Sequence, residues 1–187
     1  ATSPVRITLA GVGISSLFLA LTLAVLATSR LFAFASLTFI GGSLFGRGWD
    51  DVNAAWPFAV AGLGLSWLMA QPLNILILGD DVAAELGLKV ERTRWAGLAL
   101  AAVLGGTAVK VAGLVGFVGL VIPHVARFLV GQDYRQVLPA SALVGAAFIM
   151  ACDIVARNVI APAEVPMGVV SAAVGVPFFL YLLRRAR

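Results

Sequence analysis

Residues 137–160 read VLPASALVGAAFIMACDIVARNVI, an apolar run with one acidic and one basic residue near its end. A helix needs about 20 mainly apolar residues to cross the hydrocarbon core of a bilayer. This run is long enough, and its two charged residues are four positions apart, where they can pair on one helical face. The run therefore predicts a transmembrane helix.

The rest of the chain has the same character. Its 187 residues are 61% apolar and 12% charged, with a mean hydropathy of +1.03, whereas an average soluble domain is about a quarter charged. We expect six spans, rich in small residues that permit close helix packing. The predicted fold class is all-α, a polytopic membrane bundle that occupies residues 1–187 as one domain. The predicted spans are residues 4–28, 54–78, 95–112, 114–130, 137–160 and 167–183.

The distribution of basic residues predicts the topology. Residues 31–45 are apolar but short and are closed by glycines, so we expect a short interfacial helix there. Six spans place both termini on one side, and nine of the thirteen Lys and Arg residues lie on that side, which makes both termini cytoplasmic. The nine are Arg6, Lys89, Arg92, Arg94, Arg127, Arg135, Arg184, Arg185 and Arg187. Because the chain starts without Met and almost directly in an apolar run, we expect it to be part of a longer polypeptide.

Residues 79–94 form a charged cytoplasmic loop between the second and third spans. Asp80 is placed to cap a short helix that has Asp81 in its first turn, where an acidic group is favourable. Gly87 can end this helix in a left-handed conformation. The predicted helix covers residues 81–86.

Val82 and Leu86 would lie on one face of that helix at i, i+4 spacing. An ordinary interspan loop is the alternative interpretation. A cytoplasmic helix with an apolar stripe nevertheless indicates a surface for a protein partner.

Asp153 and Arg157 are the charged residues of the opening stretch, and they lie toward its outer end. Charges at membrane depth are costly and are normally paired. Two interpretations stay open: a structural ion pair within the bundle, or a guanidinium held near the outer surface to meet a carboxylate on a partner.

Residues 116–135, GFVGLVIPHVARFLVGQDYR, contain His124, the only histidine. Pro123 should kink the fourth span or mark the start of its regular helix, with His124 in the first turn. Neither a metal site nor a nucleophilic triad has its other members nearby, so we predict a structural hydrogen-bonding role. A tight cytoplasmic turn that ends at Arg135 follows, with Asp133 as the cap of the fifth span.

Several functional classes are excluded by what the sequence lacks. There is no Walker A loop, dinucleotide fingerprint or HExxH motif, so we expect no catalytic residue, no bound cofactor and no metal site. The basic residues form no continuous patch for nucleic acid. If a nucleotide powers transport, ATP binds to another chain.

The motifs together resemble the FecCD-type permeases, which are membrane subunits of ABC importers for ferric siderophores, haem and cobalamin. The resemblance covers nearly the whole chain and corresponds to the C-terminal part of such a subunit. It rests on LNILILGDDVAAELGL, GLVGFVGLVIPHVARFLVGQDYRQVLPASALVGA, DIVARNV and AEVPMGVVSAAVGVPFFLYLLRR. Tyr134 departs from the histidine that the family often has.

The resemblance implies a role for each end of the bundle. Residues 79–88 match the coupling loop that an ABC ATPase subunit holds in a groove, and Arg157 matches an outer arginine that meets an extracytoplasmic substrate-binding protein. The predicted coupling residues are Asp80, Asp81, Val82, Glu85, Leu86 and Gly87. A permease dimer in the inner (plasma) membrane of a prokaryote is also implied, which moves its cargo by alternating access.

The resemblance implies the chemical class of the transported substrate but not its identity. An iron–siderophore complex is the leading prediction, with haem or cobalamin as alternatives. A zinc or manganese ABC permease should carry acidic or histidine residues along its pathway, and the spans have few. An ion-coupled secondary transporter would use ionisable groups near the midplane, and Asp153 is the only intramembrane carboxylate.

Overall fold

The structure is a computed structural model that describes residues 4–28, 39–159 and 165–185. The described residues form helices, turns and loops without strands, which confirms the all-α prediction. The chain divides into two compact units, residues 1–40 and 41–187. In the first, helix α1 (Pro4–Thr28) has the bounds predicted for the first span.

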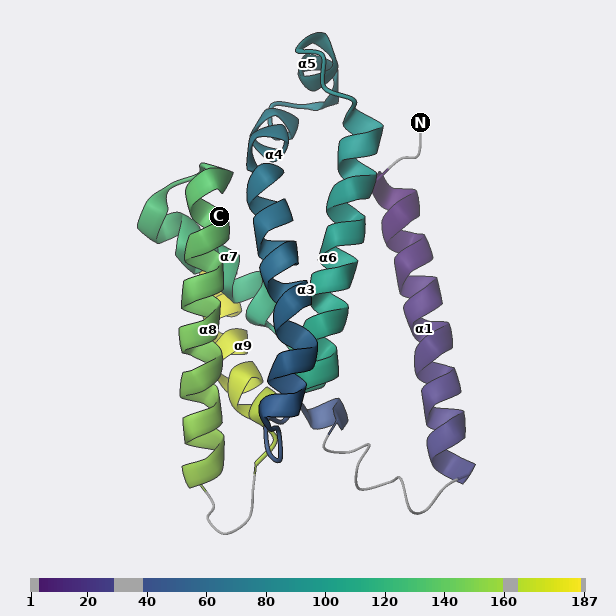
Figure 1. Cartoon of the computed structure of the whole chain (residues 1–187), viewed down its shortest axis with the longest axis vertical. Coiled ribbons are helices and arrows are strands. Elements are labelled where there is room, and N and C mark those ends of the chain that lie inside the picture. Colours follow the sequence, from purple (N-terminus) through teal and green to yellow (C-terminus); the bar gives the residue numbers. More distant parts are fainter. Residues whose placement is uncertain (1–3, 29–38, 160–164, 186–187) are drawn as a thin grey trace. The chain divides into compact units, whose positions relative to one another are not determined.

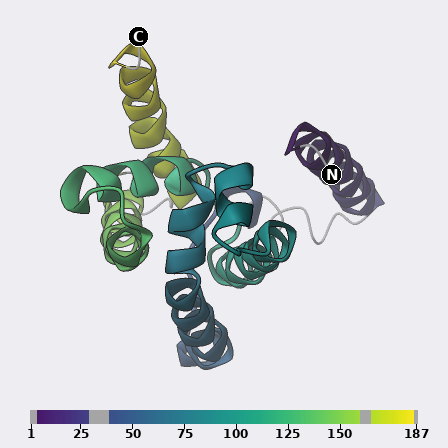
Figure 2. The same ribbon diagram turned by 90° about the horizontal axis from the view of Figure 1, so that it is seen from above.

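The second unit holds helices α3 to α9 (Figure 1). They are α3 (Trp49–Leu68), α4 (Ala70–Leu76), α5 (Asp80–Glu85), α6 (Val90–Ala112), α7 (Val118–Val130), α8 (Tyr134–Asn158) and α9 (Met167–Arg185). Helix α3 packs against α6 and α8, while α8 also packs against α4, α7 and α9. Viewed along the bundle in Figure 2, α7 lies across the end of α8.

Length and composition identify the helices that can cross a membrane. Helices α6 and α8 are each long and apolar enough, as is the pair α3 and α4 taken as one bent span. Apolar segments of 10–17 residues lie within α1 at Leu9–Val25, in α7 at Val118–Val130 and within α9 at Met167–Leu180. The count of six spans and the cytoplasmic termini stay predictions, and most of the expected interfacial helix at 31–45 lies outside the described residues.

The predicted span 54–78 is two helices that meet at a bend. Helix α3 starts earlier than predicted, and α4 is bent from it by 48° after Met69. Pro72 explains the bend because it has no N–H to donate to the Leu68 carbonyl four residues before it. The bend directs α4 toward the α7–α8 turn.

Helix α7 corrects the prediction for Pro123. It runs without interruption from Val118, so Pro123 lies inside the helix and does not start it. The chain reverses just before α7, at Gly113 with φ 71° and Phe117 with φ 64°. This reversal fixes where the helix begins. Pro123 is the sixth residue of α7, so the helix lacks the hydrogen bond that an N–H at this position would donate to the Gly119 carbonyl.

Close backbone contacts hold the end of the unit where α6 ends and α9 begins. The Ser43 amide donates to the Ala112 carbonyl at 2.9 Å, and the Met167 amide donates to the Gly42 carbonyl at 2.8 Å. Met167 is buried with Cys152 of α8. We call the contacts among residues 41–43, 112–114 and 167–168 the backbone junction.

Candidate functional site

Helix α5 lies at one end of the second unit, between α4 and the start of α6 (Figure 1). It begins at Asp80, one residue earlier than predicted, and Gly79 is its N-cap with φ 105°. The prediction that Asp80 caps the helix is therefore wrong. Because the helix already includes Asp80, its carboxylate is not at the cap position, and it accepts instead from Nη2 of Arg94 on α6 at 2.9 Å and 3.1 Å.

The end of α5 confirms the predicted left-handed glycine. Gly87 has φ 82°, and its amide donates to the Ala84 carbonyl at 2.9 Å. The Leu88 amide then donates to the Ala83 carbonyl at 3.0 Å. The helix is thus closed at both ends by glycine.

Helix α5 turns most of its surface outward. Ala83 is fully buried, but Val82 is 43% exposed and Leu86 is 61% exposed. The side chains of Asp81 and Glu85 are also exposed. An outward face with both apolar and acidic groups is suited to a protein partner, and the coupling role of these residues stays a prediction.

The α7–α8 turn is bound to α4 by a set of hydrogen bonds that we call the polar clamp. The Asn74 amide donates to Oδ1 of Asp133 at 2.6 Å and accepts from the Tyr134 backbone N–H at 2.9 Å. The Arg135 guanidinium donates to Oε1 of Gln71 at 2.9 Å. The clamp therefore brings two side chains of α4 together with a turn some sixty residues later.

Asp133 has the predicted capping role. Its carboxylate accepts from the Arg135 backbone N–H at 2.9 Å, and it is the N-cap of α8. This backbone hydrogen bond and then the amide of Asn74 hold the pKa of Asp133 below its ordinary value of 3.8, against a smaller opposing effect of burial. The carboxylate is therefore favoured in its charged form.

Tyr134 connects the clamp to α7. The Arg127 guanidinium donates to the Tyr134 hydroxyl at 3.1 Å and lies 5.6 Å from the ring centroid. A cation over an aromatic face adds attraction to the hydrogen bond. Helices α4, α7 and α8 thus converge on the clamp.

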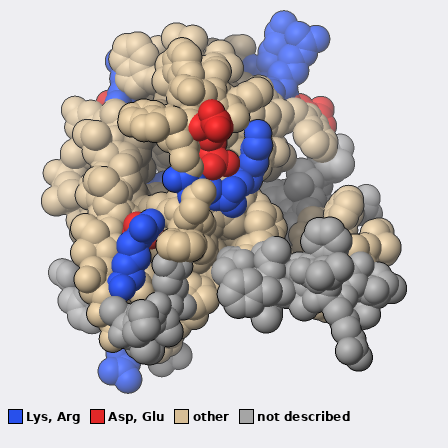
Figure 3. Space-filling view, turned by 60° about the horizontal axis from the view of Figure 1, so that its bottom comes forward, with Lys and Arg blue, Asp and Glu red and all other residues tan. Residues whose placement is uncertain are grey.

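Arg157 and Asp153 form the predicted ion pair at the other end of α8. Nε of Arg157 lies 2.8 Å from Oδ2 of Asp153, and the two side chains are 47% and 21% exposed. The Nη groups of Arg157 make no further hydrogen bond within the described part of the chain. Figure 3 shows this end, where isolated acidic and basic groups lie side by side in a largely uncharged surface.

His124 does not make the hydrogen bond that the sequence predicted. Its side chain is exposed on α7 and has no hydrogen-bond partner among the residues that the structure describes. The described ranges also contain no group of three His, Cys, Asp or Glu residues placed to hold a metal ion.

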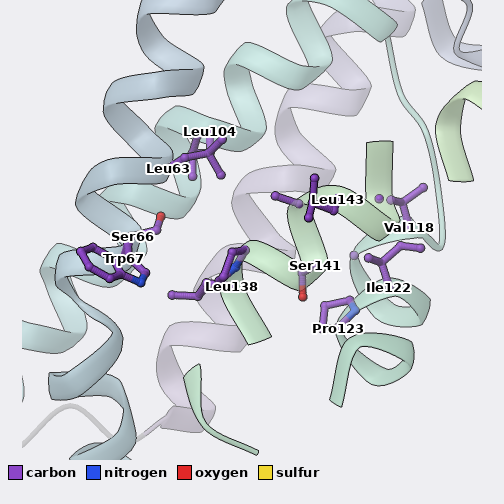
Figure 4. Close-up of a pocket in the computed structure, with 14 residues that line it drawn as sticks. Leu63, Ser66, Trp67, Leu104, Val118, Ile122, Pro123, Leu138, Ser141 and Leu143 are labelled. Carbon is purple, nitrogen blue, oxygen red and sulfur yellow. The ribbon is translucent and has the colours of Figure 1, made fainter. Parts of the chain in front are cut away.

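A cavity of about 590 Å³ lies between α3, α6, α7 and α8 (Figure 4). Its lining is mainly apolar, with Trp67, Leu104 and Ile122 among the side chains that face it. Ser66 is one of its few polar groups, and its hydroxyl already donates to the Gly62 carbonyl at 2.7 Å. The cavity offers packing and little directional recognition.

Sequence reasoning missed the partners of the polar clamp. Asn74 and Gln71 have no local signal, because the residues they contact are distant in sequence. Arg94 was predicted only as one of the basic residues that indicate the membrane topology. The i, i+3 spacing of Gln71 and Asn74 places both on one face of α4, but it does not show which residues they contact.

These features are those of a membrane-embedded helical domain: helices apolar and long enough to span a bilayer, and a short helix with an exposed face at one end. Comparison with known proteins gives the family. A model of the FecCD transport family matches residues 1–185, and the chain belongs to this family.

Three similar proteins illustrate the relationship. The Probable siderophore transport system permease protein YfiZ of Bacillus subtilis is 40% identical over 98% of this chain and 55% of its own length. The cobalamin import system permease protein BtuC of Halobacterium salinarum is 42% identical over 94% of this chain and 47% of its own. A solved structure described as a metal-chelate type ABC transporter in an inward-facing conformation matches with a TM-score of 0.92 and 30% identity, over 98% of this chain and 60% of that one. The chain therefore spans about half the length of the curated relatives it matches.

Proposed function

We propose that this chain is part of the permease of an ABC importer that carries a metal chelate across the membrane. The observation that carries the proposal is the match of 98% of the chain, at a TM-score of 0.92, to a metal-chelate type ABC transporter. The substrate class we propose is an iron–siderophore complex, as in the name of the B. subtilis relative. Cobalamin is the second candidate, because a cobalamin permease is 42% identical.

The chain supplies a route and a mechanical linkage in this proposal, and no chemistry. A separate ATPase subunit binds the exposed face of α5 and hydrolyses ATP. A substrate-binding protein docks at the opposite end, where Arg157 offers its two Nη groups. Two permease units together enclose the pathway in the plasma membrane of a prokaryote, with the α5 end in the cytoplasm.

Uptake by the reconstituted importer tests the proposal. The chain, within the polypeptide in which it occurs, is placed in liposomes with the ATPase and binding protein encoded beside it. We expect ATP-dependent uptake of a radiolabelled ferric siderophore, with a hydrolysis-deficient ATPase as the control. Uptake of cobalamin but of no iron chelate would change the substrate class, and accumulation without ATP would contradict the proposal.

A further inference from the structure

The polar clamp holds α4 to the α7–α8 turn with a two-point contact. One amide, that of Asn74, donates to Asp133 at 2.6 Å and accepts from the Tyr134 N–H at 2.9 Å. A primary amide can satisfy an acceptor and a donor at once only in one orientation. Asn74 therefore fixes both the distance and the rotation between α4 and the start of α8.

A second contact lies one helical turn earlier on α4. Gln71 accepts from the Arg135 guanidinium at 2.9 Å, and its charged donor makes this a stronger hydrogen bond than a neutral one. Two contacts one turn apart resist tilting of α4 against the turn. The Arg127 guanidinium extends the same network to α7 through the Tyr134 hydroxyl.

The other connections of the α4–α5 segment are looser. On the α3 side there is the 48° bend after Met69, next to a proline that cannot complete the helical hydrogen bonds. On the α6 side, Asp80 meets only one nitrogen of Arg94, and the Asp80 side chain is 54% exposed. Exposed pairs of this kind hold their partners weakly.

We infer that Asn74 is a positioning residue that passes a displacement of α5 to α7 and α8, so that the displacement is not absorbed at the bend between α3 and α4. The inference rests on the proposed function, because it takes α5 as the surface on which the ATPase acts. In this mechanism α4, α5 and the α7–α8 turn move as one body. The bend after Met69 is the joint about which they move.

The first test compares uptake with hydrolysis in the full importer. For Asn74→Ala we expect at least a five-fold loss of chelate transported per ATP hydrolysed, while the affinity for the ATPase stays within two-fold. Asn74→Asp should lose as much, because it places a second carboxylate against Asp133. The double exchange N74D/D133N restores a donor opposite an acceptor and should recover most of the lost uptake per ATP. Asn53→Ala is the matched control, since Asn53 is exposed on α3 and has no hydrogen bond within the described residues.

Three results would overturn the inference. Uptake per ATP within two-fold of the unaltered protein in Asn74→Ala would show that no displacement passes through the clamp. Failure of N74D/D133N to recover would show that the Asn74–Asp133 pair is not what matters. Loss of ATPase affinity in Asn74→Ala, with uptake per ATP unchanged in the complexes that still form, would make Asn74 an assembly residue.

A distance measurement tests the inference separately from transport. Spin labels on Ala84→Cys and Gln136→Cys, with Cys152→Ala, report the separation of α5 from the start of α8. We expect the distance between the two labels to stay the same when the ATPase and nucleotide are added. In the Asn74→Ala variant the same addition should shift or broaden this distance. A distance that changes equally with and without Asn74→Ala overturns the inference. Failure of the proposed function would appear as no chelate uptake by the unaltered importer, and the label distances would still be readable.

Discussion

Truncation of the exposed apolar pair on α5 should weaken the binding of the ATPase by a calculable amount. The change is Val82→Ala with Leu86→Ala, which removes two and three carbon groups. Each is worth about 0.8 kcal/mol when buried. Val82 is 43% and Leu86 61% exposed, so docking can bury only those fractions, and the pair is worth about 2 kcal/mol. We expect an increase in Kd of about 30-fold.

The assay is a titration of purified ATPase onto the permease in lipid nanodiscs, with Kd read from binding at equilibrium. Ile154→Ala with Val155→Ala is the matched control, because these α8 residues are 62% and 45% exposed. The control variant should bind the ATPase with a Kd within two-fold of that of the unaltered protein. Its Tm should also equal that of the unaltered protein. An increase below three-fold in the α5 variant, or an equal increase in the control, would refute the assignment of α5 as the docking surface.

Three further predictions concern other parts of the chain. Arg157→Glu should raise the Kd of the substrate-binding protein about ten-fold, mainly through a slower on-rate, as measured by surface plasmon resonance; an unchanged Kd in a folded variant would remove this docking role. Gly175→Ala should lower the Tm, because a Cβ there would lie 2.5 Å from Cβ of Phe117 and overpacking costs about 1–3 kcal/mol; Gly64→Ala, which meets nothing within 4 Å, should not, and equal Tm values would contradict the contact. Folding lowers the pKa of Asp133, so its carboxylate stabilises the protein fully above pH 3.8 and loses this effect as the pH falls through the lower pKa of the folded state. The Tm difference between the unaltered protein and Asp133→Asn should therefore narrow from pH 5 to pH 2.5. A difference that widens over this range would contradict the lowered pKa.

Local sequence signals predicted the features whose causes are local. The left-handed Gly87, the Asp133 cap and the ion pair of Asp153 with Arg157 each depend on residues within a few positions, and all three are confirmed. Apolar length predicted the bounds of α1 closely for the same reason. The family resemblance, which rests on long motifs in order, is confirmed as well.

The errors arise where a distant contact decides the local structure. Asp80 looked like a cap, but Arg94 fourteen residues later takes its carboxylate. Pro123 was predicted to kink the fourth span or to start its regular helix, and the second alternative is wrong because the reversal before α7 sets the start at Val118. No spacing rule could pair Asn74 with a residue fifty-nine positions away, because such pairing depends on how the helices pack.

The two ends of the second unit are held by different chemistry, and this difference indicates where movement can occur. The backbone junction leaves no room for side chains: a Cβ at Gly168 would overlap the Gly41 carbonyl, and one at Gly42 would lie 2.8 Å from the Leu114 carbonyl. Close-packed backbone cannot shift by a fraction of an ångström without steric overlap. The polar clamp depends instead on side-chain hydrogen bonds near the surface, each worth about 1 kcal/mol net because water can replace either partner. The junction therefore stays fixed, while in the mechanism proposed above the three hydrogen bonds of the clamp together keep α4, α5 and the α7–α8 turn moving as one body about the bend after Met69.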